Sequence, residues 1–176
     1  MNADEFINRA AAGERDFDGA ELAGVVLAAA SLRRIRWRRA RLVEIDLRGA
    51  DLTAADLRDA RLTAVDLRGA HLFQADLRKV QMARVELSGA NLHGANLHEA
   101  ELAGVQIRAA HLLGADLRRT NLRGANLQGA NLIRADLRDA DLRGANLIEA
   151  MLLDTDLRGA RTDGARMPEP PRDRPV

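Results

Sequence analysis

Large apolar residues recur at every fifth position of this 176-residue chain. From Leu22 to Leu157 they fill 28 successive positions, of which 25 are Leu and the others are Trp37, Met82 and Ile107. A five-residue step turns an α-helix by about 140° net, so no single helix face collects these side chains. In a strand an odd period places successive leucines on opposite faces. The pattern therefore predicts a chain that turns a corner every five residues and keeps every leucine inside.

A second period gives the number of sides. Two residues before each leucine position lies a small or β-branched residue, which is Ala at 19 of the 28 sites. The β-branched ones recur at a spacing of twenty on one side, at Val25, Ile45, Val65, Val85 and Val105. Because equivalent residues of a solenoid stack on the next coil, this spacing predicts four sides for each coil. The fold class is all-β: a quadrilateral β-helix of about seven coils of 20 residues, roughly 35 Å long.

The repeated unit reads Ala-(Asp/Asn)-Leu-x-x, as in Ala90-Asn91-Leu92-His93-Gly94. In tandem it resembles the pentapeptide repeat family, and the resemblance extends over about four-fifths of the chain. It implies a right-handed coil, a short N-terminal helical cap and a bacterial protein that binds other proteins. The spacing of the residues does not itself give the handedness.

The two ends of the chain differ from the repeats. Residues 1–17 are expected to form the helical cap, because Phe6, Ile7 and Ala10 have helical spacing. Residues 18–161 form the predicted solenoid. Residues 162–176 contain all four prolines and no apolar period, so we expect a disordered Pro/Arg-rich tail. The last coil would then have no lid.

Charge and composition narrow the function. The 27 basic and 26 acidic residues give a net charge of +1, so no direct binding to nucleic acid or to a membrane surface is expected. There is no cysteine, no apolar stretch long enough to span a bilayer, and no apolar run at the start of the chain. We expect a cytoplasmic protein.

One side of the predicted coil carries arginine directly after the leucine. This Arg ladder consists of Arg58, Arg78, Arg118, Arg138 and Arg158, with His98 in the same row. An Asp or Asn lies two residues before each member of the row. The ladder either binds anions or is neutralised by these acids, and we favour neutralisation, in which each exposed pair contributes about 0–1 kcal/mol.

A neighbouring side carries apolar residues that point away from the filled core. They form an apolar strip of Phe73, Leu113, Ile133 and Leu153, with Met151 on the same side and Ile148 on the adjacent one. Monomeric proteins rarely expose such a concentration of apolar residues. We interpret the strip as a partner surface, most simply that of a homodimer. Packing beneath the C-terminal tail is the alternative.

The first coil is surrounded by arginines. This basic belt consists of Arg33, Arg34, Arg36, Arg38, Arg39 and Arg41, which all point outward while Trp37 fills an inward leucine position. A phosphate-rich or acidic partner is one interpretation. The other, which we favour, is that acids of the preceding cap neutralise the belt.

No catalytic group is expected. His71, His93 and His111 share one side, but they lie on a convex surface with no carboxylate held in a dry pocket. We therefore predict no enzyme activity, no cofactor, no metal and no catalytic residue.

The predicted function is a protein-interaction scaffold, homodimeric through its C-terminal coils, whose protein partner is not identified. The alternative comes from the resemblance: quinolone-resistance members of the family mimic DNA and bind a type II topoisomerase, DNA gyrase, which they modulate or protect from quinolone-type inhibitors. The balanced charge and the uninterrupted repeats of this chain make the alternative the weaker one.

Overall fold

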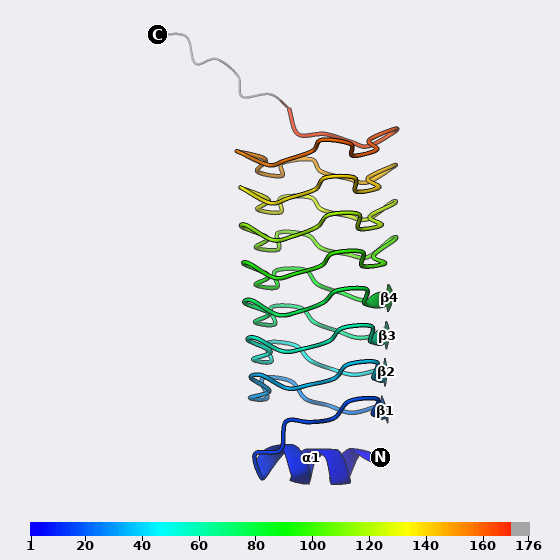
Figure 1. Cartoon of the computed structure of the whole chain (residues 1–176), viewed down its shortest axis with the longest axis vertical. Helices are drawn as coiled ribbons and strands as arrows, with labels where there is room; N and C mark the ends of the chain where they lie inside the picture. The colour runs from blue at the N-terminus through cyan, green and yellow to red at the C-terminus, as the bar shows by residue number, and fades with distance from the viewer. Residues whose placement is uncertain (170–176) are drawn as a thin grey trace.

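The computed structural model describes residues 1–169 as a stack of coils with one helix at its N-terminal end (Figure 1). The helix begins the chain, and four short strands lie on one side of the stack in the order β1-β2-β3-β4, all parallel. Their bounds are α1 Ala3–Ala11, β1 Glu21–Ala23, β2 Arg41–Val43, β3 Arg61–Thr63 and β4 Gln81–Ala83.

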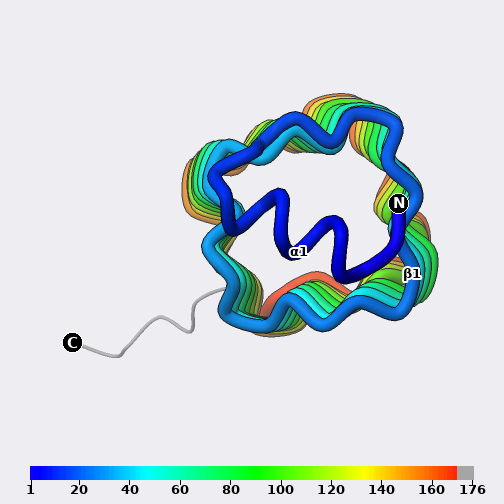
Figure 2. Tube along the Cα trace, turned by 90° about the horizontal axis from the view of Figure 1, so that it is seen from below, coloured from blue at the N-terminus to red at the C-terminus, as the bar shows by residue number. Residues whose placement is uncertain are grey.

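Every strand pairs with the segment twenty residues further on. Leu22 of β1 is in register with Leu42 of β2. On the other three sides, parallel bridges keep the same offset, as at Asp16↔Arg36, Val26↔Asp46 and Ser31↔Asp51. Seen along the stack, the coils superpose in a four-cornered outline (Figure 2). The twenty-residue period and the four sides predicted from the β-branched residues are confirmed.

The corners explain why the period is five. In a typical corner the backbone N–H of Ala50 donates to the carbonyl of Leu47 at 3.0 Å. Gly49 lies inside this turn with φ of 62°, the left-handed value that the third residue of a type II turn requires. Residues other than glycine take the same conformation at many corners, for example Asp59 with φ of 59°. Tight corners of this kind return the chain to the next side after every fifth residue.

The interior is filled by the predicted inward residues. Ala90 and Leu92 are both fully buried, as are nearly all their equivalents between Leu22 and Ala150. Thr120 takes the place of an inward Ala, and its hydroxyl donates to the Leu97 carbonyl at 2.9 Å. A buried hydroxyl is tolerated there because it is hydrogen-bonded. The inward register deduced from the sequence is therefore confirmed.

Helix α1 closes the N-terminal end of the stack. It crosses the opening of the first coil (Figure 2). The side chain of Asn2 caps it by accepting a hydrogen bond from the backbone N–H of Glu5 at 2.8 Å. Phe6 is fully buried, and its ring centroid lies 4.7 Å from that of Phe17 and 5.7 Å from that of Trp37. Three of the four aromatic residues therefore gather where the helix meets the first coils.

At the C-terminal end the coil continues further than expected. Arg166 pairs with Asn146, and the N–H of Ala165 donates to the Thr162 carbonyl at 2.9 Å across a corner at Gly164. The predicted start of a disordered tail at residue 162 is therefore wrong for residues 162–166. They have lost the inward Leu but keep the corner Gly and the inward Ala, which suffice to continue the ladder. The rest of the predicted tail includes residues 170–176, which lie outside the described residues.

Candidate interaction surfaces

The Arg ladder is a row of ion pairs. Nε of Arg58 donates to Oδ1 of Asp56 at 2.8 Å, and Nη2 donates to Oδ2 at 2.6 Å. The backbone N–H of Arg58 also donates to Asp56, at 3.3 Å. Nε of Arg58 lies 3.5 Å from a carboxylate oxygen of Asp76 in the next coil. Each guanidinium of the ladder thus binds its own aspartate through the two-pronged geometry that suits carboxylates, and those of Arg58, Arg118 and Arg138 face the aspartate of the next coil as well.

The same pairing recurs along the ladder and on neighbouring sides. It joins Asp46 to Arg48, Asp66 to Arg68, Asp76 to Arg78, Asp116 to Arg118, Asp136 to Arg138, Asp141 to Arg143 and Asp156 to Arg158. The side-chain hydrogen bonds from arginine lower the pKa of the Asp46, Asp141 and Asp156 carboxyls to about 2. The carboxylates are therefore ionised at neutral pH and occupy the guanidinium groups, which favours neutralisation over anion binding.

Half of the basic belt is neutralised in the same way. Nη1 of Arg33 lies 3.0 Å from Oδ2 of Asp51. Arg36 and Arg38 both bind Asp18, a residue that precedes the first strand. Hydrogen bonds from the Arg38 side chain lower the pKa of the Asp18 carboxyl. Arg36 and Arg38 thus pair with an acid from the start of the chain, whereas Arg33 pairs with an acid of a later coil.

The other three arginines of the belt are not neutralised in this way. Within residues 1–169, Arg34, Arg39 and Arg41 have no carboxylate oxygen within the 4.0 Å of an ion pair. Arg39 and Arg41 line one groove together with Arg61 and Lys79. The belt is therefore continued along the rod by two cations that the sequence reasoning did not include.

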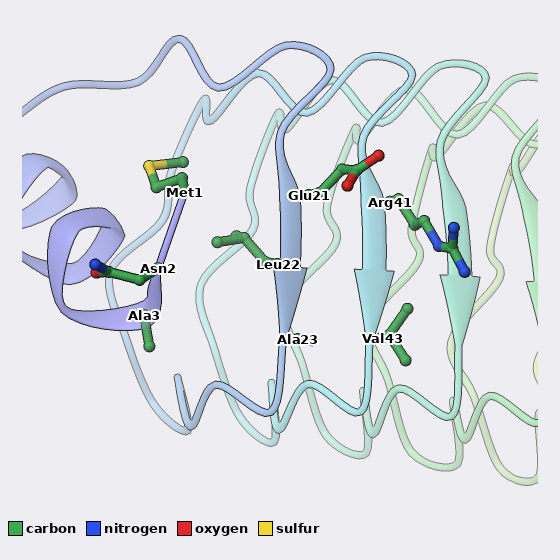
Figure 3. Close-up of a pocket in the computed structure, with 8 residues that line it drawn as sticks. All are labelled: Met1, Asn2, Ala3, Glu21, Leu22, Ala23, Arg41 and Val43. Carbon is green, nitrogen blue, oxygen red and sulfur yellow. The ribbon is translucent and has the colours of Figure 1, made fainter.

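A second groove lies between the start of the chain and the first strands. It is lined by Met1, Asn2, Ala3, Glu21, Leu22, Ala23, Arg41 and Val43 (Figure 3). The Glu21 side chain extends from β1 towards β2, and the Arg41 side chain extends from β2 over the next strand (Figure 3). Both side chains lean towards the later coils, so the Arg41 guanidinium lies on the side of β3.

The apolar strip is brought together as expected. Leu113, Ile133 and Leu153 lie one coil apart and Phe73 two coils before Leu113, because neighbouring residues pair in the series His71↔Asn91↔His111↔Asn131↔Met151. Phe73, Leu113 and Ile133 are half-buried, as is Ile148 on the adjacent side. Leu153 is 66% exposed and Met151 47%. Exposure of the strip is thus greatest at the C-terminal coils.

The inward residues of the last coils are also incompletely covered. Leu152 and Leu157 are only partly buried although they occupy inward positions, and Met167 beyond them is 40% exposed. The N-terminal end, by contrast, buries Phe6 completely under α1. Among the described residues, no helix covers the C-terminal end (Figure 1).

Comparison with protein-family models extends over most of the repeats. A model described as a pentapeptide repeat region matches residues 15–92, and one described as pentapeptide repeats matches eight copies within residues 100–139 and 125–161. Together the matches span well over half of the chain. The chain belongs to the pentapeptide repeat family.

Solved structures of other pentapeptide repeat proteins are similar to this one. HetL of the cyanobacterium Nostoc sp. strain PCC 7120, involved in heterocyst differentiation regulation, is 31% identical over 95% of this chain and 97% of its own, with a TM-score of 0.41. Rfr23 of the cyanobacterium Cyanothece 51142 is 24% identical over 93% and 98%, with a TM-score of 0.38. QnrB1, a plasmid-mediated fluoroquinolone resistance protein, is 18% identical over 86% and 85%, with a TM-score of 0.45. No curated protein matches the chain.

Two further observations concern chemistry in this pentapeptide repeat protein. His71, His93 and His111 line a shallow groove with Leu113, but residues 1–169 contain no group of three or more His, Cys, Asp or Glu able to hold a metal ion. In the same part of the chain, no helix has the length and apolar character needed to cross a membrane.

The sequence reasoning missed the groove formed by Arg39, Arg41, Arg61 and Lys79. A signal was available: Arg41 and Arg61 stand at the repeat position that most often holds Asp or Asn. Arg41 was assigned to the basic belt, and Arg61 was assigned to no feature. Their shared side becomes informative once the coils are aligned at an offset of twenty.

Proposed function

We propose that this pentapeptide repeat protein is a non-enzymatic interaction scaffold that forms a homodimer through its C-terminal coils. The observation that supports the proposal most directly is the exposure of apolar side chains at that end: Leu153 is 66% exposed, Met151 47% and Met167 40%. Apolar surface removed from water stabilises an association by about 25 cal/mol per Å² before the entropic cost of binding. The apolar strip leads towards this end and would extend the interface along one side.

Two-fold pairing is the simplest arrangement for such an end. A second copy brings the same patch to the contact, so one interface covers both incompletely buried ends, with Leu152 and Leu157 in each. It also shields the last coil, whose outer backbone groups would otherwise offer an edge for aggregation. The N-terminal end requires no second copy to cover it, because α1 already does so.

The double substitution Ile133→Asp and Leu153→Asp is expected to give a monomer in multi-angle light scattering. A carboxylate placed in an apolar interface must lose its hydration without gaining a partner, which disfavours association. Both side chains are at least partly exposed in the single chain, so folding should be retained.

The matched control is Val26→Asp, because Val26 is 70% exposed and lies in the first coil, at the opposite end of the rod. This variant should keep the mass of the parent protein. If the double variant is still a dimer, the apolar strip is not part of the interface. A parent protein that is monomeric would reject the homodimer itself.

The finer architecture is proposed on the same basis. We take the coil to be right-handed, with about seven turns, preceded by a cap over residues 1–17, in a protein of the bacterial cytoplasm. Membership of the pentapeptide repeat family supports the handedness, and the constant pairing offset of twenty residues supports the coil count.

Binding to DNA gyrase is a second candidate function. It is favoured by the rod form of the molecule (Figure 1), which a mimic of duplex DNA requires. A mimic of duplex DNA also requires an acidic surface. In this chain the ladder aspartates are paired with arginines, and the net charge is +1. The scaffold is therefore the first candidate.

We expect the purified protein to leave DNA gyrase supercoiling unchanged at micromolar concentration, with or without a quinolone. Because the charges of the ladders are neutralised, the protein lacks the negative electrostatic field that would compete with DNA for the basic DNA-binding groove of gyrase. An agarose-gel supercoiling assay checks this. Inhibition, or rescue of supercoiling from the drug, would make gyrase binding the function instead.

A further inference from the structure

One groove on the strand side of the rod gathers four cations. Its lining includes Arg39, Arg41, Arg61 and Lys79, together with two carboxylates, and the complete set is Glu21, Arg39, Ala40, Arg41, Asp59, Arg61, Lys79 and Gln81. Four cations against two carboxylates leave a formal excess of two positive charges. The groove follows β1–β4 along the rod and therefore spans several coils.

Arg41 and Arg61 differ from the arginines of the ladder. A ladder arginine follows an aspartate by two residues and forms a two-pronged pair with it, as Arg58 does with Asp56. Arg41 and Arg61 instead occupy the Asp/Asn place of the repeat, and within residues 1–169 neither has a carboxylate oxygen within 4.0 Å. Their guanidinium groups therefore remain available to a ligand.

The two arginines are also direct neighbours. Arg41 of β2 is in register with Arg61 of β3, and strands of a sheet lie about 4.8 Å apart. Like charges placed opposite each other on adjacent strands are destabilising. The Arg41 side chain leans over the strand that carries Arg61 (Figure 3). An anion bound between them would replace this repulsion with attraction to both.

The carboxylates of the groove do not cancel this site. Glu21 extends towards β2, which carries Arg41 (Figure 3), but within residues 1–169 no Arg or Lys nitrogen lies within 4.0 Å of its carboxylate. Within residues 1–169, Asp59 has no Arg or Lys nitrogen within 4.0 Å of its carboxylate. Lys79 lies 3.6 Å from Glu99 in a largely exposed pair, which is worth little in water. The region around Arg41 and Arg61 therefore keeps the excess of positive charge.

We propose that this groove binds a diphosphate group, with Arg41 and Arg61 as its principal ligands. The planar fork of arginine fits two oxygens of a phosphate at once. A single phosphate would meet the two stacked arginines, whereas a second linked phosphate would also reach Arg39 or Lys79 on the rim. The excess of positive charge in the groove suits a multiply charged anion.

Isothermal titration of the whole protein with inorganic pyrophosphate tests the proposal. The parent protein should bind it saturably with one site per chain. The variant Arg41→Gln/Arg61→Gln should bind at least tenfold more weakly, a change of about 1.4 kcal/mol. The matched control Arg118→Gln/Arg138→Gln removes the same charge from the ladder and should change the affinity by less than about threefold, since distant exposed charges are screened.

A second measurement shows that the variant remains folded. Because Arg41 and Arg61 are exposed and repel each other, the thermal midpoint of Arg41→Gln/Arg61→Gln should equal or exceed that of the parent without ligand. Added pyrophosphate should raise the midpoint of the parent and not that of the variant.

Titration with ADP and AMP identifies the source of the diphosphate. Tighter binding of ADP than of pyrophosphate indicates a nucleoside diphosphate, and equal binding indicates recognition of the diphosphate group alone; both support the site. Absence of saturable pyrophosphate binding overturns the proposal. So does an equal loss of affinity in the ladder control, or binding of a glutamate-rich peptide without binding of pyrophosphate.

Discussion

Replacing Leu92 with alanine is expected to lower the free energy of unfolding by about 2–5 kcal/mol. Leu92 is fully buried, and it stacks between the equivalent leucines of the coils before and after it, Leu72 and Leu112. The cavity left by the substitution would therefore remove contacts from three coils at once. In a solenoid each coil is supported only by its neighbours, so such a loss in the middle of the rod is not shared with the rest of the molecule.

Chemical denaturation followed by circular dichroism measures the effect. The control is His93→Ala, the next residue, whose exposed side chain leaves the core intact and should change stability by less than about 0.5 kcal/mol. Similar losses in the two variants would contradict the stacking of leucines as the main source of stability.

Replacing Phe6 with alanine is expected to cost about 3–5 kcal/mol and to open the N-terminal end. Phe6 is the only residue of α1 that is fully buried, and its ring contacts those of Phe17 and Trp37. Without it the helix has little apolar surface left to hold it on the first coil. The backbone edge beneath would then be exposed, and the variant should aggregate more readily.

Trp37 supplies the measurement, because it is the single tryptophan of the chain and is fully buried. Its fluorescence should shift to the red in Phe6→Ala. The control is Ile7→Ala, which alters the neighbouring residue of the same helix, 41% exposed, and should leave the emission unchanged. An unshifted spectrum in Phe6→Ala would mean that α1 stays in place without its buried ring.

The fold was largely predictable because one residue type recurs at an odd period. A five-residue step excludes a helix and a flat strand, and the β-branched residues from Val25 to Val105 give the number of sides. The end of the coil was harder to place. The segment from Thr162 to Arg166 has lost its leucine, and only the backbone geometry at Gly164 shows that a corner persists.

The candidate surfaces were predictable in position but not in chemical state. Aligning residues at an offset of twenty placed the Arg ladder and the apolar strip correctly on their sides. The sequence left open whether Arg58 binds its aspartate or an anion from solution, since this depends on the distances of the guanidinium to Asp56. It predicted that acids of the cap neutralise the belt, but not which arginines they reach: Asp18 pairs with Arg36 and Arg38, whereas within residues 1–169 Arg39 and Arg41 have no carboxylate oxygen within 4.0 Å.

The constant pairing offset has a consequence for how such a rod changes in evolution. Each residue lies on one side of one coil, and residues twenty positions apart lie on the same side of adjacent coils. An insertion of twenty residues lengthens the rod by one coil and keeps every column aligned. An insertion of five turns everything after it by a quarter of a revolution, so that a surface such as the one from Phe73 to Leu153 is split between two faces. Lengths that preserve a binding surface are therefore quantised in whole coils.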